Sequence, residues 1–311
     1  MDPRITAVTD ELFFIQRGWL NANHLVFTGS PRTLIDTAYI RDRAETESLI
    51  TQTGLGIEQV ELIINTHAHC DHIGGNADFQ RRSGCQIALH EVDRYNVDQK
   101  NAMATWSGYY QQEAEFFSTH GTLVDGAVVT LGEMDFLVMH TPGHGMGQIV
   151  LHGLDTGWLI SADNVWAGGD FGVLTTRIEG LDAPFRMRDS LERLARLNVK
   201  RIFPGHGPIL EDGPAAIEAC LARVGAFIAE PIRMGRDQVR KIMLYALMMR
   251  GPERREELAQ RLYQSPWFPE VAELYFGGRL EQTFAENLEY LMDKGLVVED
   301  DQGRLVCTLT A

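Results

Sequence analysis

The stretch THAHCDHIGG, residues 66–75, decides the fold of this 311-residue chain. It follows VELIINT (60–66), a continuous apolar run that predicts a buried strand, so the polar side chains emerge where the strand ends. Residues i and i+2 of an extended segment point to the same side, which allows His67 and His69 to bind one metal ion together. The sequence therefore predicts half of a metal site at a strand end.

The second half of this motif turns the chain. Gly74 and Gly75 permit a tight turn and close packing of the helix that we expect to follow. That turn can direct Asp71 and His72 toward a neighbouring ion. Imidazole and carboxylate ligands suit Zn²⁺, and also Fe²⁺ or Mn²⁺. We therefore expect two divalent ions, with Zn²⁺ as the first expectation and Fe²⁺ or Mn²⁺ as alternatives.

Three later segments each place one further ligand type just after an apolar run. They are TPGHG with His144, SAD with Asp163 and PGHG with His206. A lone histidine or aspartate at a strand end is usually structural, but four such segments in this order are hard to explain as core residues. The carboxylate of Asp163 is suited to bridge two cations.

Together the four segments resemble the metallo-β-lactamase superfamily over roughly residues 5–210. HAHCDH matches the HxHxDH motif, and the other three segments match the remaining ligand motifs in the right order. The resemblance implies two sets of three ligands with one carboxylate between them. The implied ligands are His67, His69 and His144 for the first ion, Asp71, His72 and His206 for the second, and Asp163 for both.

The pattern is similar to the glyoxalase II, thioesterase, lactonase and ribonuclease branches of this superfamily. Lactam-cleaving enzymes with a cysteine ligand fit less well because Asp163 stands at that position, and His69 replaces the glutamate of the flavodiiron branch. The family mechanism implies that two ions lower the pKa of a shared water from about 15.7 toward 7, and that the bridging hydroxide attacks the substrate. Asp71 is the candidate catalytic residue that orients this water or accepts its proton.

The remaining sequence predicts an α/β protein of two domains. Strands and helices up to residue 210 suggest a metallo-β-lactamase αββα sandwich at 1–210, with a long, aromatic and helical insertion at 91–120. Residues 211–311 predict a helical, winged-helix-like C-terminal domain, similar to the tail of the β-lactamase-like protein 2 group. Its expected helices span 214–229, 233–250, 253–263 and 281–295, before a hairpin-like end.

Aromatic side chains gather in the insertion and after the third ligand segment. Packing onto the sheet explains most of them, but some are candidates for the wall of a substrate pocket beside the metals. The candidate substrate-binding residues are Trp106, Tyr109, Tyr110, Trp166 and Phe171.

Charge and cysteine content restrict the partners. A formal net charge of −15 disfavours nucleic acid and membrane surfaces, and no basic stripe is visible in the sequence. Four cysteines without a CxxC spacing, and a start that is not a signal peptide, favour a cytoplasmic protein. A homo-oligomer is left open.

We therefore expect a metal-dependent hydrolase acting on an ester-like bond of a small or acyl substrate, with thioesters first and lactones or other esters next. A metal-dependent ribonuclease is the first alternative, although the acidic charge argues against it. An unusual C–O bond-cleaving member or an iron-dependent member of the superfamily is the second.

Overall fold

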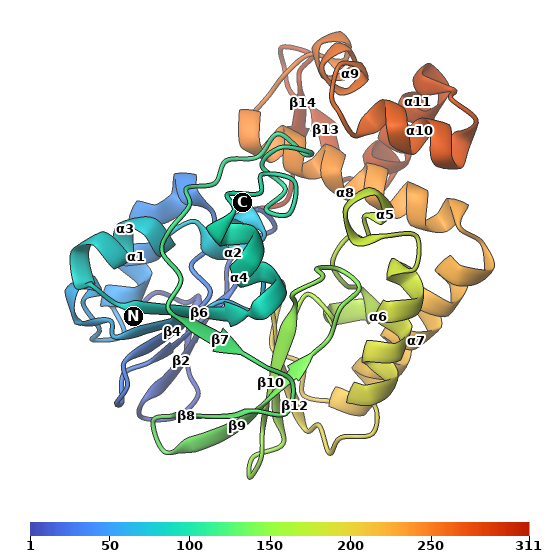
Figure 1. Ribbon diagram of the computed structural model, residues 1–311. Helices are drawn as coiled ribbons and strands as arrows, with labels where there is room; N and C mark the ends of the chain where they lie inside the picture. Colours follow the sequence, from blue (N-terminus) through green and yellow to red (C-terminus); the bar gives the residue numbers. More distant parts are fainter. Residues whose placement is uncertain (311) are drawn as a thin grey trace.

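The computed structural model describes residues 1–310, and two β-sheets form its centre (Figure 1). The first sheet contains seven strands in sequence order, antiparallel from β1 to β4 and parallel from β4 to β7. Its strands are β1 (Ile5–Ala7), β2 (Leu12–Ile15), β3 (His24–Phe27), β4 (Thr33–Ile35), β5 (Leu62–Ile64), β6 (Gln86–His90) and β7 (Gly121–Leu123).

The second sheet contains five strands in the order β12-β11-β10-β9-β8, and only the β11–β12 pair is parallel. Residues up to 123 therefore supply one sheet, and residues 128–204 supply the other. The strands of this sheet are β8 (Val128–Leu131), β9 (Met134–His140), β10 (Ile149–Gly153), β11 (Trp158–Ala162) and β12 (Arg201–Pro204).

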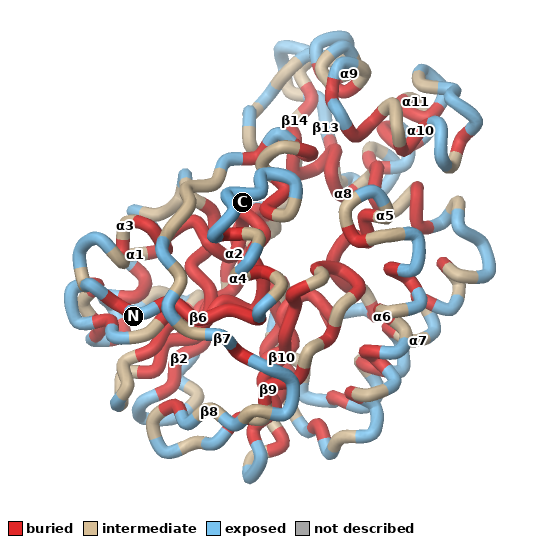
Figure 2. Tube along the Cα trace, viewed as in Figure 1, coloured by how far each residue is buried: buried red, intermediate tan, exposed pale blue. Residues whose placement is uncertain are grey.

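Apolar residues fill both faces of each sheet. In β2, Leu12 and Phe14 lie in the core between the sheets, whereas Phe13 and Ile15 face the covering helices, so every residue of this strand is buried. Figure 2 shows the buried strands as the red interior of the molecule. The αββα sandwich predicted from the sequence is confirmed.

Two groups of helices cover the sheets. The first sheet is covered by α1 (Arg43–Thr51), α3 (Asn76–Ser83) and α4 (Glu91–Asp98), and the second by α6 (Ala183–Leu194) and α7 (Gly213–Ala229). Because α7 shares the core of the second sheet, we propose to move the predicted domain boundary from residue 210 to about residue 230.

The C-terminal helices pack around one long helix, α8 (Ile232–Arg250). Their apolar core also includes residues of the N-terminal half and of the 91–120 segment. The other elements are α9 (Arg255–Tyr263), α10 (Phe268–Phe276), α11 (Leu280–Asp293), β13 (Val297–Glu299) and β14 (Leu305–Cys307). α10 was not predicted from the sequence, and the likeness to a winged helix stays a prediction. Across residues 1–310, no helix combines the length and hydropathy needed to cross a membrane.

The helical insertion predicted at 91–120 is wrong over most of its length. Only Glu91–Asp98 is helical, and the rest consists of turns and extended chain. Lys100, Trp106 and Gln111 have positive φ values of 53°, 67° and 55°, which a right-handed helix does not accommodate. Residues with helical composition therefore form an irregular loop over the first sheet.

Candidate metal centre

All seven predicted ligands converge at one edge of the two sheets, and every one of them is buried. The first four follow β5 and enter the short helix α2 (Cys70–Ile73). The loops after β9, β11 and β12 present His144, Asp163 and His206. The site thus lies where the two sheets meet, and each sheet contributes part of it.

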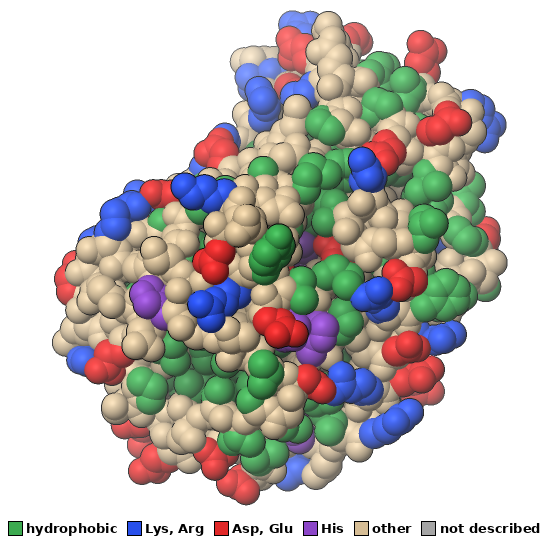
Figure 3. All heavy atoms as spheres, viewed as in Figure 1, with side chains coloured by type: hydrophobic (Ala, Val, Ile, Leu, Met, Phe, Trp, Pro, Cys, Tyr) green, Lys and Arg blue, Asp and Glu red, His purple; other side chains and the backbone are tan. Residues whose placement is uncertain are grey.

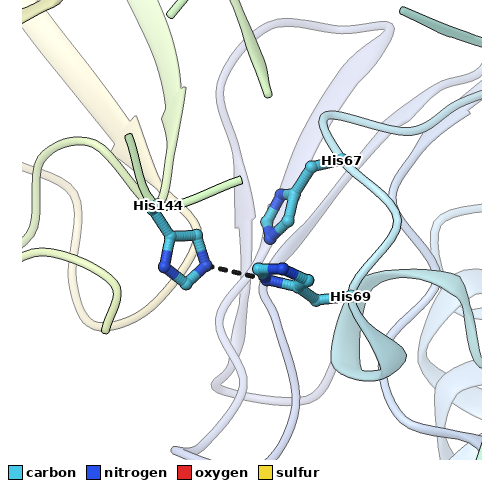
Figure 4. A group of neighbouring side chains, drawn as sticks. All are labelled: His67, His69 and His144. Carbon is cyan, nitrogen blue, oxygen red and sulfur yellow. Dashed lines mark hydrogen bonds between the residues drawn. The ribbon is translucent and has the colours of Figure 1, made fainter. Parts of the chain in front are cut away.

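The first ligand set consists of three imidazoles that face a common point (Figure 4). His67 and His69 come from the loop after β5, and His144 comes from the second sheet. The Nδ1 atom of His69 lies 2.9 Å from the Nε2 atom of His144. One candidate ligand atom of each residue lies within 4.8 Å of the other two, a separation that one cation can span.

The second set lies beside the first and combines one carboxylate with two imidazoles. The Oδ2 atom of Asp71 is 3.3 Å from His206 Nε2 and 3.9 Å from His72 Nε2. This mixture of nitrogen and oxygen ligands suits a first-row divalent cation.

Asp163 stands between the two sets. Its Oδ2 atom is 3.1 Å from His144 Nε2 in the first set and 3.5 Å from His72 Nε2 in the second. Burial alone would raise the pKa of Asp163, but His72 and His206 hold it well below the ordinary value. The carboxylate is therefore ionised and faces both sets.

Several buried polar atoms of these residues have no hydrogen-bond partner, and this bears on whether the residues fit a pair of cations. The Nε2 atoms of His67, His72 and His206 are buried without a hydrogen-bond partner among the described residues. Buried polar atoms normally have partners, so this concentration requires an explanation. Burial also lowers the pKa of His67 well below its ordinary value, which leaves this imidazole in the neutral form that binds metals. The residues fit two divalent cations.

Hydrogen bonds on the far side of the imidazoles fix their orientation. His144 Nδ1 donates to the carbonyl of Val173 at 2.8 Å, and His206 Nδ1 donates to the carbonyl of Gly18 at 3.3 Å. A proton held on Nδ1 leaves the lone pair of Nε2 free to bind a cation.

Asp36, which was not predicted from the sequence, fixes the orientation of His72 in the same way. Its Oδ2 atom accepts from His72 Nδ1 at 2.8 Å and from the hydroxyl of Thr66 at 2.7 Å, while its Oδ1 atom accepts from the Thr66 amide at 2.9 Å. Asp36 directly follows β4, the parallel neighbour of β5. Its place at the end of a strand is the signal from which it could have been predicted.

Two further buried carboxyl groups lie behind His69. Asp93 accepts a hydrogen bond from the amide of Ala68 at 2.9 Å, and burial raises the pKa of Asp93 to about 7. The Oε1 atom of Glu179 lies 4.0 Å from His69 Nε2, and burial raises the pKa of Glu179 well above its ordinary value. Both line a cavity of about 370 Å³ that reaches His69.

Of the five predicted substrate-binding residues, the structure brings Trp106 and Trp166 to the metal centre. The ring of Trp106 stacks on His69, with centroids 3.9 Å apart. The ring of Trp166 packs edge-on against His206 at 4.8 Å, and its Nε1 atom donates to Asp163 Oδ1 at 3.3 Å.

The other three predicted residues take up packing positions. Tyr109 donates to Glu270, and the hydroxyl of Tyr110 accepts from Gln238, so both rings join the 91–120 segment to the C-terminal helices. Phe171 is fully buried in the core beneath the second sheet, and its place in a pocket wall stays a prediction.

Comparison with known proteins decides the family. The model of the metallo-β-lactamase superfamily matches residues 17–206. The chain belongs to this superfamily. A superfamily member of known structure, a metallo-β-lactamase family protein from Thermus thermophilus, has the same fold with a TM-score of 0.61 at 22% identity, covering 97% of this chain and 100% of that one.

Two curated relatives match half or more of the chain. The acyl-coenzyme A thioesterase MBLAC2 of Bos taurus is 29% identical over 192 residues, which cover 57% of this chain and 64% of the relative. A hydroxyacylglutathione hydrolase of Maricaulis maris is 33% identical over 156 residues, half of each chain. Each match spans less than two thirds of the relative.

Proposed function

We propose that this superfamily member is a dinuclear metal-dependent hydrolase of thioesters. One observation carries the proposal: the Asp163 carboxylate lies between two complete ligand sets, within 3.5 Å of an imidazole from each. The names of the relatives favour the thioester bond, since one is an acyl-coenzyme A thioesterase and another a hydroxyacylglutathione hydrolase. These two thioester types are our candidate substrates.

His67, His69 and His144 would hold the first cation, Asp71, His72 and His206 the second, and Asp163 both. Five imidazoles and two carboxylates favour Zn²⁺, with Fe²⁺ and Mn²⁺ as the alternatives. Two bound divalent cations supply a water of lowered pKa and polarise the carbonyl under attack.

Asp71 has the geometry to move a proton. Its Oδ2 atom faces His206, whereas its Oδ1 atom is buried and has no partner among the described residues. Oδ1 is therefore free to accept the proton of an attacking water and to pass it to the leaving thiolate. The other six ligands position the site without holding this proton.

Aromatic rings restrict access to the site. Trp106 packs against His69 and Trp166 packs against His206, so both rings would narrow the space around the reacting carbonyl. On the face drawn in Figure 3, acidic and basic side chains are interspersed rather than gathered into a basic band. With a net charge of −15, this favours a small substrate over a nucleic acid.

We also propose a cytoplasmic location. Cys70, Cys85, Cys220 and Cys307 are all free thiols, as the sequence spacing indicated. Unpaired cysteines are typical of a reducing compartment.

The test is a panel of thioesters, lactones and esters with protein whose metal content has been measured. We expect thioesters to react fastest and Asp71→Asn to lose about 10²–10⁴-fold in kcat, because a general base is removed. Asp155→Asn, at an exposed turn, is the matched control and should keep full activity. Failure of the metal-loaded protein on every thioester would contradict the proposal. RNA cleavage that vanishes with His69→Ala would favour the ribonuclease. Bound iron without any hydrolysis would favour an oxidoreductase.

A further inference from the structure

A cavity of about 710 Å³ lies among α7, α8 and α11, beyond the metal ligands. Three of its wall residues, Trp19, Asp170 and Leu309, also line a second cavity of about 310 Å³. That smaller cavity is lined by His206 and Trp166 of the metal centre. The two cavities therefore adjoin and lead from a metal ligand to the face of α8.

The larger cavity is rich in positive charge although the chain as a whole is acidic. Its basic lining residues outnumber the acidic ones, with Asp170, Glu230 and Asp237 as the acids. The basic lining residues are Arg223, Arg233, Arg236, Arg240 and Lys241.

Some of these charges are neutralised within the protein. Lys241 Nζ is 2.6 Å from Asp170 and 3.2 Å from Asp237, and Arg223 is 2.6 Å from Asp237. Arg233 pairs with Glu230 one turn earlier in the chain. These side chains therefore form a balanced ion-pair network at the cavity wall.

Arg236 and Arg240 remain without a carboxylate partner among the described residues. They are four residues apart on α8, so their side chains share one face of the helix. The guanidinium of Arg240 lies 3.4 Å above the ring of Tyr290, and its Nε donates to Asn287 at 3.0 Å. Burial lowers the pKa of Arg240, and the charge of Arg236 lowers it further, so the two like charges repel each other.

A ligand with several negative charges would neutralise Arg236 and Arg240 together. Guanidinium groups bind phosphate oxygens through paired N–H donors, and two neighbouring groups suit a diphosphate better than a single carboxylate. The cavity volume is in the range of pockets that hold one small ligand. The ring of Tyr290 adds an apolar wall beside the charges.

We infer that this cavity binds the phosphate-bearing carrier of a thioester substrate, with Arg236 and Arg240 pairing with its phosphates. The acyl end of the substrate then extends past Trp19 toward the metal centre. This inference rests on the proposed thioesterase activity and selects, between the two candidate thioesters, the coenzyme A type over the glutathione type.

Two thioesters with the same acyl group distinguish binding of the carrier from hydrolysis of the thioester bond. Butyryl-coenzyme A carries phosphates, whereas butyryl-N-acetylcysteamine has the same scissile bond and none. Each of Arg236→Gln and Arg240→Gln should raise KM for the coenzyme A thioester roughly tenfold, the effect of one lost charge-assisted hydrogen bond, with kcat nearly unchanged. KM for the short thioester should not change. Arg250→Gln, exposed at the end of the same helix, is the matched control.

Calorimetric titration of the metal-loaded protein with coenzyme A gives a readout that needs no turnover. The affinity for coenzyme A should fall by the same factor in both variants. The affinity for a hydroxyacylglutathione thioester should change little. Arg240→Gln removes contacts to α11, so Arg236→Gln, whose side chain has no ion-pair partner among the described residues, separates binding from folding.

Equal kinetics of the variants and the parent protein on butyryl-coenzyme A would overturn the inference and leave the thioesterase proposal intact. Arginine-dependent binding of single-stranded RNA in preference to coenzyme A would also overturn it. Arginine-dependent binding of coenzyme A without any thioester hydrolysis would support the cavity assignment and reject the proposed activity.

Discussion

Asp36→Asn should weaken the second metal site more than the first. Asparagine keeps an oxygen that can accept from the Thr66 amide, but it replaces the Oδ2 acceptor with an NH₂ group. That group donates to His72 Nδ1 and so forces the imidazole proton onto Nε2, the atom that faces Asp71 and Asp163. His72 then cannot bind a cation without losing this proton.

The structure also sets the size of this effect. The 2.8 Å bond from His72 to Asp36 is charge-assisted, and such bonds contribute about 1.5–3 kcal/mol. At about 1.4 kcal/mol per factor of ten, the second site should lose roughly 10–100-fold in affinity. The first site should lose less affinity, because none of its three histidines contacts Asp36 directly. His67 reaches Asp36 only through the Thr66 hydroxyl, which lies 3.2 Å from His67 Nδ1 and 2.7 Å from Asp36 Oδ2.

Competition with a chromophoric zinc chelator, fitted to two sites, measures both affinities in one titration. Asp125→Asn is the control, since Asp125 is a strand-end carboxylate paired with Arg193 on the exposed surface. Equal weakening of both sites, or no weakening of either, would refute the argument that Asp36 acts through the His72 tautomer.

Three further predictions concern stability. Gly74→Ala should cost about 2 kcal/mol or more in urea unfolding, because the new Cβ would lie 2.2 Å from the amide nitrogen of Ile40, whereas Gly225→Ala, in open space on α7, should be neutral or stabilising; equal effects would contradict this. Chelation should lower the melting temperature by several degrees and added Zn²⁺ should restore it, since only the folded chain assembles the site; an unchanged melting temperature would count against a preformed site. Burial, with help from His140, lowers the pKa of His90 to about 4, so between pH 6.5 and 4 the unfolded chain binds a proton that the folded chain does not. The stability of the metal-free protein should fall as the pH falls through this window, and it should fall less steeply in metal-free His90→Gln. If the urea midpoint drops equally between pH 7 and 4.5 in the parent and in the variant, His90 is excluded as a cause.

The metal ligands could be predicted because each stands in a recognisable local sequence pattern. An apolar run ends, a glycine or proline turns the chain, and a histidine or aspartate follows, as at His144 and His206. Parallel and antiparallel strands then bring these ends to one edge without further information. Asp36 also follows a strand, but it lies outside the four segments that match the family motifs.

Other features depend on contacts that no local pattern encodes. Residues 91–120 have helical composition, yet packing of Trp106 on His69 holds Trp106 at a positive φ that ends any helix. α10 was missed because the prolines around Phe268 suggest a loop, although proline is well accommodated in the first turn of a helix.

The basic cavity was hidden for a different reason. Arg236 and Arg240 occur in RMGRDQVRKI, whose four basic residues and one acidic residue are typical of an ordinary solvated helix face. Only the fold pairs Lys241 with Asp170 and leaves the two arginines unbalanced. The overall acidity of the chain gave no sign of this local excess.

The division of the ligands between the two sheets has a consequence for how the molecule could be taken apart. A cut at the turn near Gly126, between β7 and β8, would yield one fragment with His67 to His72 and another with the remaining three ligands. Neither piece could complete a cation's coordination alone. The bound cations would therefore hold the two fragments together reversibly, and the concentration of the metal would govern reassembly.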